Sequence, residues 1–121
     1  MAIVWFKEDK DLFVTLSKNN IILNKECDKL LEDYGYCILG YDKNAIYLKP
    51  VFYLSVDQNE ISEKVYKMTS TISYLRVSCT DFLSIITKVF SLDLDNNQKF
   101  LAKWSEDDKL LEIIIKDNGG E

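Results

Sequence analysis

The sequence predicts an α+β fold in which a duplicated β-α-β-β unit forms a small barrel-like or interleaved antiparallel sheet with two short helices. Residues 20–50 read as a short strand, a helix and a two-stranded hairpin, and residues 75–116 repeat this order more loosely. In both segments the hydrophobic period changes from that of a helix to that of strands. The alternative to a duplication is coincidence between two amphipathic helices that happen to precede hairpins.

The chain opens with two apolar runs, residues 2–6 and 12–16, around a charged segment at 8–11. Apolar runs that flank a polar turn predict a hairpin. Residues 18–20 then form a turn, and residues 21–23 start the first repeat.

The first helix is predicted from four residues at i, i+3, i+4 and i+7, which share one stripe of a helix. These residues are Cys27, Leu30, Leu31 and Tyr34. Asn24 precedes the stripe as an N-cap, because its side-chain oxygen can accept from unpaired amides of the first turn. Gly35 stands where a left-handed residue is needed to end the helix.

Two alternating runs, 36–41 and 45–49, flank the polar turn 42–44 and predict a hairpin whose second strand continues past Pro50 through residues 51–56. Residues 57–63 are the most polar stretch between the repeats and read as a linker. Residues 65–77 are rich in β-branched and aromatic side chains, so they predict one long strand with a bend near 69–71.

The second helix has the same spacing as the first, with Phe82, Ile85, Ile86 and Val89 on its stripe. Ser78 or Thr80 can cap it. Residues 99–104 and 110–115 then flank a polar turn and predict the last hairpin.

Length and composition indicate a single domain of 121 residues. Its expected parts are an N-terminal hairpin with the first repeat (1–56), the linker (57–63) and the second repeat (64–121). A hydrophobic content of 47% with one Pro and four Gly argues against disorder. No apolar stretch approaches the roughly 20 residues that cross a bilayer, and no basic segment precedes the N-terminal apolar run. We expect a cytoplasmic protein without membrane contact.

The residue inventory argues against catalysis, and we expect no enzyme, no catalytic residues, no cofactor and no metal. The chain has no histidine, which removes the commonest general base and metal ligand. Neither Gly35 nor Gly40 belongs to a phosphate-binding loop. Asp93 to Asn97 resembles the start of a calcium loop, but Gln98 and Trp104 stand where Gly and Glu are needed.

The three cysteines, Cys27, Cys37 and Cys79, form no close pair in the sequence and suggest neither a disulfide framework nor a redox motif. Cysteine on a core stripe commonly behaves as a small hydrophobic residue. We therefore expect all three to be buried and inert.

The doubled unit resembles the swapped-hairpin AbrB-type fold, in the duplicated single-chain form of MraZ-type proteins. The matching segments are IILNKECDKLLEDYGYCILGYDKNAIYLKP and LRVSCTDFLSIITKVFSLDLDNNQKFLAKWSEDDKLLEIII. The resemblance implies a DNA-binding transcriptional regulator, often oligomeric, as found in bacteria. The chain departs from the family in two ways. It has Asn24 and Ser78 or Cys79 where a Pro usually precedes the helix, and Arg76 is its single arginine.

Basic residues that flank the repeats are the candidates for DNA contact, because phosphates are neutralised by Lys and Arg. They are Lys18, Lys25, Lys43, Lys49 and Arg76. The alternative is a protein–protein interaction module of the same fold that has lost DNA binding, which the net charge of −5, the single arginine and the abundant Tyr fit as well as they fit a regulator. An enzyme is a third hypothesis, which a pocket with a strongly shifted carboxylate would support. The sequence leaves open whether the chain forms a homo-oligomer and whether the repeats pack within one chain.

Overall fold

The computed structural model describes residues 2–3, 11–52 and 61–115. Within these residues the strands and helices follow one another as β1 (Leu12–Leu16), β2 (Asn20–Asn24), α1 (Lys25–Leu31), β3 (Gly35–Tyr41), β4 (Ala45–Phe52), β5 (Val65–Ser70), β6 (Tyr74–Ser78), α3 (Thr80–Phe90), β7 (Gln98–Ser105) and β8 (Leu110–Ile114).

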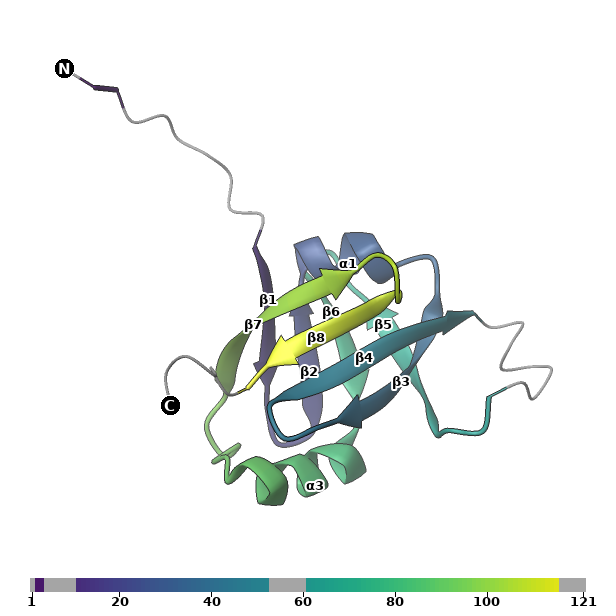
Figure 1. Cartoon of the computed structure of the whole chain (residues 1–121), viewed down its shortest axis with the longest axis vertical. Helices are drawn as coiled ribbons and strands as arrows, with labels where there is room; N and C mark the ends of the chain where they lie inside the picture. The colour runs from purple at the N-terminus through teal and green to yellow at the C-terminus, as the bar shows by residue number, and fades with distance from the viewer. Residues whose placement is uncertain (1, 4–10, 53–60, 116–121) are drawn as a thin grey trace.

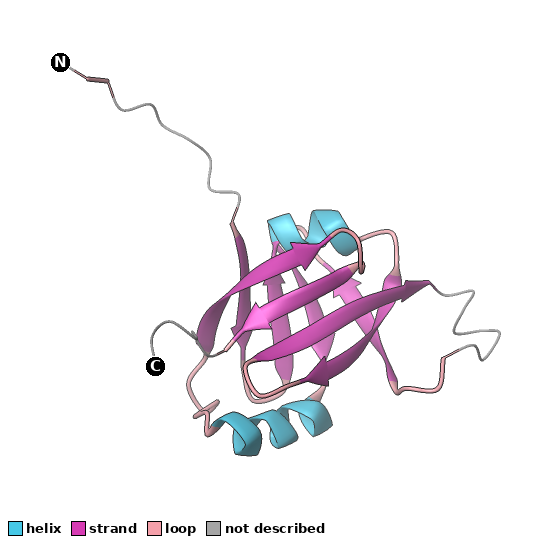
Figure 2. Ribbon diagram, in the orientation of Figure 1, coloured by secondary structure: helices cyan, strands magenta, loops and turns pink. Residues whose placement is uncertain are grey.

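The strands form one closed antiparallel barrel in the order β1-β2-β6-β5-β3-β4-β8-β7 (Figure 1). Every described strand pairs with a neighbour on both sides. The two helices are short and lie at opposite ends of the barrel (Figure 2). The predicted α+β class is therefore wrong, because the described chain is mostly β, although the closed barrel agrees with the expectation of a small barrel-like sheet. The helices cover the ends of the barrel and form no layer of their own.

The strands before residue 53 and those after residue 60 alternate around the barrel as hairpins. Hairpin β1-β2 is followed by β6-β5, then by β3-β4 and finally by β8-β7. Each half of the chain thus contributes two hairpins that do not touch each other through hydrogen bonds. The two halves close the barrel only by interleaving.

The register of pairing is the same in both halves. Val14 pairs with Leu23, and the residues 54 positions later, Met68 and Val77, pair in the same way. Ile22 and Arg76, also 54 positions apart, pair with each other. A pseudo-twofold axis therefore passes between β2 and β6, since each of these two residues faces its own counterpart.

The same exchange relates β3 to β7 and β4 to β8. The exchange converts the β3-β5 pairing, in which Cys37 faces Tyr66, into the β7-β1 pairing, in which Ala102 faces Leu12. On this correspondence Leu48 and Leu111 are counterparts, and they pair with each other between β4 and β8. The axis thus leaves the barrel between these two leucines.

The core fills the inside of the barrel with side chains that alternate along each strand. The largest fully buried residues, taken from both halves, are Val14, Leu16, Ile21, Leu23, Leu31, Ile46, Leu48, Leu75, Leu83, Ile86, Leu111 and Ile113. Intervening positions, such as Ile22 and Arg76, point outward. This alternation places β-branched and leucine side chains in one continuous core.

Helix α1 begins as predicted, because the Asn24 side chain accepts from the Cys27 amide at 3.2 Å. Gly35 has the expected positive φ, 85°, and lies where the chain turns from α1 into β3. Cys27 and Leu31 are buried, as the stripe predicted, and so is Asp28. A buried aspartate was not expected from the sequence.

Helix α3 is rotated relative to the predicted stripe. Phe82 and Ile86 are buried, but Ile85 and Val89 are exposed, and Leu83 and Phe90 take their places. The face of α3 that packs on the barrel is therefore turned about the helix axis by one residue relative to the predicted stripe.

The predicted caps of α3 are wrong. Cys79 is the N-cap and makes no side-chain capping bond. Ser78 and Thr80 donate instead to the side chains of Asn20 and Asn19, respectively. These hydrogen bonds tie the start of α3 to the turn between β1 and β2.

The predicted long strand 65–77 is two strands, β5 and β6, which form a hairpin. Its turn contains no glycine. The Thr71 hydroxyl instead accepts from the Ser73 and Tyr74 amides and donates to the Tyr74 carbonyl. A side-chain-stabilised turn of this kind left no strong signal in the sequence.

The predicted N-terminal hairpin and linker fall mostly outside the described residues. Of residues 2–6, only 2 and 3 are described, and they form no strand. The described strand β1 pairs with β2 and β7. Residues 57–60 of the predicted linker are likewise outside the described range, whereas β4 does run past Pro50 to Phe52. Within the described part of the chain, no helix is long and apolar enough to cross a membrane.

Candidate functional site

The five basic residues proposed for DNA contact are spread over the barrel. Lys18 lies in the turn between β1 and β2 and Lys43 in the turn between β3 and β4, both at the α3 end (Figure 1). Lys25 starts α1 at the other end. Lys49 on β4 and Arg76 on β6 are separated by β5 and β3. The barrel therefore does not bring these five side chains into one patch.

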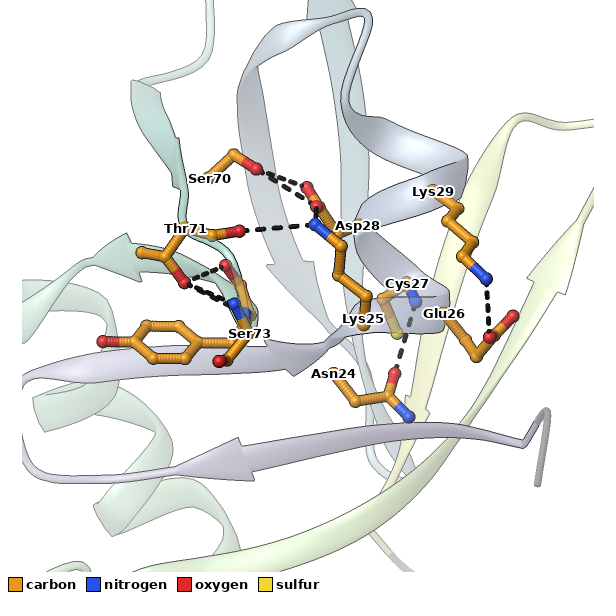
Figure 3. Close-up of polar contacts among 10 residues, drawn as sticks. Asn24, Lys25, Glu26, Cys27, Asp28, Lys29, Ser70, Thr71 and Ser73 are labelled. Carbon is orange, nitrogen blue, oxygen red and sulfur yellow. Dashed lines mark hydrogen bonds and ion pairs between the residues drawn. The ribbon is translucent and has the colours of Figure 1, made fainter. Parts of the chain in front are cut away.

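Lys25 is engaged within the fold. Its ammonium lies 2.6 Å from Asp28 Oδ2 and 3.3 Å from the Thr71 carbonyl oxygen (Figure 3). Asp28 is fully buried, and the Ser70 hydroxyl donates to its carboxylate at 3.0 and 3.1 Å. The contacts join α1 to the β5-β6 hairpin. The buried Asp28 carboxylate therefore has a structural role, because it accepts hydrogen bonds from both Lys25 and Ser70.

The cysteines are free and buried, as expected. Burial raises the pKa of Cys27, Cys37 and Cys79 to about 12 in each case. A thiol nucleophile reacts as its thiolate, which these surroundings disfavour at neutral pH. The described residues also contain no group of three His, Cys, Asp or Glu side chains arranged to hold a metal ion.

The acidic loop before β7 is a turn. Asp93 Oδ1 accepts from the Asp95 amide at 3.1 Å, and the Asp93 carbonyl accepts from Gln98 Nε2 at 2.8 Å. These bonds use Asp93 to shape the approach to β7. The interpretation of this loop as a turn therefore agrees with its contacts.

A groove of about 480 Å³ lies between α3 and the turn before β2. Its walls include two lysines, Lys18 and Lys88, and two aspartates, Asp93 and Asp95. The opposite charges balance, so the groove has no strong preference for an ion of either sign.

A second concave surface lies on the outer side of β4, β8 and β7, and we call it the β7 face. It consists of Tyr47, Lys99, Leu101, Lys103, Glu112 and Ile114. These residues border a shallow concavity of about 650 Å³. The concavity combines apolar side chains with charged ones, as binding surfaces for proteins commonly do.

Leu101 lies on β7, along one side of the β7 face, with 53% of its surface exposed. Lys99 and Lys103 lie two residues away on either side, so all three point outward from β7. The neighbouring strand β1 places Phe13 opposite Leu101. The Lys99 ammonium lies 4.1 Å from the centre of the Phe13 ring, a cation–π contact that holds this lysine against the barrel.

The rim of the β7 face at the β3-β4 turn is held by Asp42. Its carboxylate accepts from the amides of Asn44 at 2.8 Å and Ala45 at 2.9 Å, and from the Tyr47 hydroxyl at 2.7 Å. The Asn44 amide, followed by the Tyr47 hydroxyl, holds the pKa of Asp42 below its usual value. The same bond raises the pKa of Tyr47 to about 12. Tyr47 is thus fixed in position as a protonated phenol.

Lys99, Leu101 and Lys103 were not recognised from the sequence. The only signal is their alternation with Phe100 and Ala102, which face the core. That alternation predicts a strand with one polar and one apolar face. It does not say that the outer face stays uncovered.

Comparison of the chain with protein-family models, with curated proteins and with solved structures finds no match.

Proposed function

We propose that this protein is a non-catalytic binding protein that docks a partner protein on the β7 face. The observation that carries the proposal is a half-exposed Leu101 between two lysines on β7, in the lining of a concave surface. Apolar residues surrounded by a polar rim are typical of protein interfaces. Contact with nucleic-acid phosphates depends on Lys and Arg and does not require an exposed leucine.

The closed barrel restricts how a partner can bind. Addition of a partner strand requires an unpaired sheet edge, and each described strand is paired on both sides. The partner is therefore expected to contact side chains of the β7 face. Lys99 and Lys103, four residues apart on one strand, are about 13 Å from each other along β7. This spacing suits a partner that presents acidic groups on either side of an apolar anchor.

The proposal is tested by placing a photo-reactive amino acid at position 101 of the full chain and at position 72 as a control. Ile72 is 94% exposed in the β5-β6 turn, far from the β7 face in the order of strands. We expect position 101 alone to capture the same partner repeatedly. Leu101→Asp should then weaken binding of that purified partner at least about tenfold, as loss of an interface anchor does. Equal sensitivity to Ile72→Asp would contradict the proposal.

A second candidate is the DNA-binding regulator of AbrB-like type, with the two halves of the chain derived by duplication. Each half of the structure adds one strand, β1 or β5, before the β-α-β-β unit predicted from the sequence. The interleaving of hairpins and the shared register favour it, since swapped-hairpin proteins interleave two units. Lys43 and Lys49 also belong to the hairpin that borders the β7 face.

Anisotropy of labelled duplex DNA at low and moderate salt separates the two candidates. Binding that falls steeply with salt, and with Lys49→Ala and Arg76→Ala, would favour the regulator. Binding that survives these changes but is lost in Lys99→Ala and Lys103→Ala would place DNA on the β7 face. Absence of binding at low salt would leave the protein partner as the function.

A further inference from the structure

Helix α3 carries an exposed apolar strip that the core does not use. Ile85, Val89 and Tyr41 are 49%, 41% and 46% exposed, respectively. The Tyr41 ring lies 6.3 Å from that of Phe82, which is nearly buried beneath the strip. We call these four residues the α3 flank. The strip is continuous, because Phe82, Ile85 and Val89 follow one another at three- and four-residue spacings along the helix.

Opposite charges border the α3 flank at its two ends. Asp81 lies in the first turn of α3 and Lys88 in the last. The Asp81 side chain contacts Lys64 and Tyr66 but is still 51% exposed. In the described part of the chain, Lys88 forms no ion pair. Each end of the helix can therefore accept a further charged neighbour.

The order of these charges suits a second copy of the same helix. When two identical helices cross antiparallel, the first turn of one faces the last turn of the other. A crossing centred on Ile85 brings Ile85 against Ile85 of the second copy and each Lys88 towards Asp81 of the other chain. The contact is self-complementary, as a twofold interface requires.

We propose that the α3 flank binds a second copy of this chain, with the two α3 helices antiparallel and crossing at Ile85. This proposal is independent of the partner on the β7 face, since the two surfaces share no residue. The geometry predicts that each helix makes two apolar contacts around the crossing point. It also predicts two ion pairs, one on each side of the crossing, each between Asp81 of one chain and Lys88 of the other. Self-complementarity of this kind is a requirement of an interface between two identical chains, whereas a different protein partner does not require it.

The size of the contact sets the strength of the dimer. An 11-residue helix is about 16 Å long, so the buried area falls in the low range of specific interfaces, below about 1,200 Å². We therefore expect a monomer–dimer equilibrium that depends on protein concentration, with rapid exchange.

Sedimentation velocity of the full chain between about 5 µM and 1 mM tests the proposal, because weak interfaces dissociate in this range. Ile85→Glu should raise the dissociation constant at least about tenfold. Leu101→Glu is the matched control, since it introduces the same charge at a residue of similar exposure on the β7 face. It should leave the dimer unchanged.

The charge arrangement is tested separately at low salt. Lys88→Glu places two acidic groups opposite each other in the dimer and should weaken it, whereas Lys103→Glu should not. If Ile85→Glu fails to show a cooperative thermal transition, Lys88→Glu and Val89→Glu decide the question. A chain that stays monomeric at about 1 mM overturns the proposal. A dimer lost in Leu101→Glu but not in Ile85→Glu overturns it as well, and assigns self-association to the β7 face.

Discussion

Asp28 and Lys25 show how one polar pair closes an end of the barrel. Counted from the start of each helix, Asp28 in α1 occupies the same position as Leu83 in α3. Its hydrogen-bond donor Ser70 corresponds in the strand register to Leu16. Both leucines are fully buried. One end of the barrel is therefore closed by apolar packing and the other by a carboxylate, an ammonium and a hydroxyl.

The two members of the ion pair differ in burial, and this difference predicts unequal effects of mutation. Lys25→Ala leaves a buried carboxylate without its cation and should lower the free energy of unfolding by about 3 kcal/mol. Asp28→Ala leaves a lysine that is 45% exposed and can return to water, so the expected loss is smaller, about 1–2 kcal/mol. The double variant should resemble Asp28→Ala, because the two residues act together.

Urea unfolding measures all three variants. Lys29→Ala is the control, since it removes a more exposed ion pair with Glu26 on the same helix and should cost less than about 1 kcal/mol. A Lys25→Ala variant as stable as the wild type would show that Asp28 does not depend on its cation.

At the scale of elements, the β3-β4 turn fixes the rim of the β7 face through Asp42. Because the folded-state pKa of Asp42 is lowered, its contribution to stability is present above the pKa of the unfolded chain and is lost as pH falls through the folded pKa. Removal of one donor reduces that contribution.

Tyr47→Phe removes the second-largest cause of the Asp42 shift, after the Asn44 amide. We expect the pKa of the Asp42 carboxyl to rise towards its ordinary value without reaching it. The variant should be less stable than the wild type at neutral pH. The difference should disappear in acid, where the Asp42 carboxyl is protonated in both proteins. NMR titration of the Asp42 carboxyl reports the change directly. Tyr74→Phe, on β6, should leave the Asp42 titration unaltered, and an unaltered titration in Tyr47→Phe would refute the role of the phenol.

The sequence predicted most elements from local patterns, because capping and alternation depend on nearby residues. Asn24, Gly35 and the turn at 42–44 are examples. The hairpin turn at Thr71 was predicted only as a bend in one long strand, since a hydroxyl stabilises the turn without glycine. The Lys99-Leu101-Lys103 face was missed for another reason. Alternation shows which side chains leave the core, whereas exposure depends on whether a helix covers them.

At the scale of the whole molecule, closure of the barrel depends on pairs that are distant in sequence. The pairings β2-β6 and β4-β8 join residues at least 50 positions apart and contain the pseudo-twofold axis. Local patterns carry no information about such pairs, so the sequence left open whether the sheet is barrel-like or interleaved and did not predict the order in which the strands close it. The axis also explains why two halves that resemble each other weakly in sequence share one register.

The leucines on the axis give this symmetry a measurable consequence. Leu48 and Leu111 are fully buried and face each other across β4 and β8, so their environments are related by the same exchange of halves. Leu48→Val and Leu111→Val each remove one methylene and should lower the free energy of unfolding by similar amounts, about 1 kcal/mol. Because the two side chains are neighbours in the core, the loss of unfolding free energy in the double variant should differ from the sum of the two single losses by at least about 0.5 kcal/mol.

Leu94→Val provides the comparison, because Leu94 lies between α3 and β7 and pairs with neither leucine. Combined with Leu48→Val it should be additive within about 0.5 kcal/mol. Urea unfolding of the single and double variants gives all the values. Strict additivity for Leu48 and Leu111, or widely different single effects, would mean that the two halves meet at this point without packing as equivalents. Coupling between them would instead show that the interleaved halves form one cooperative core whose centre lies on the axis.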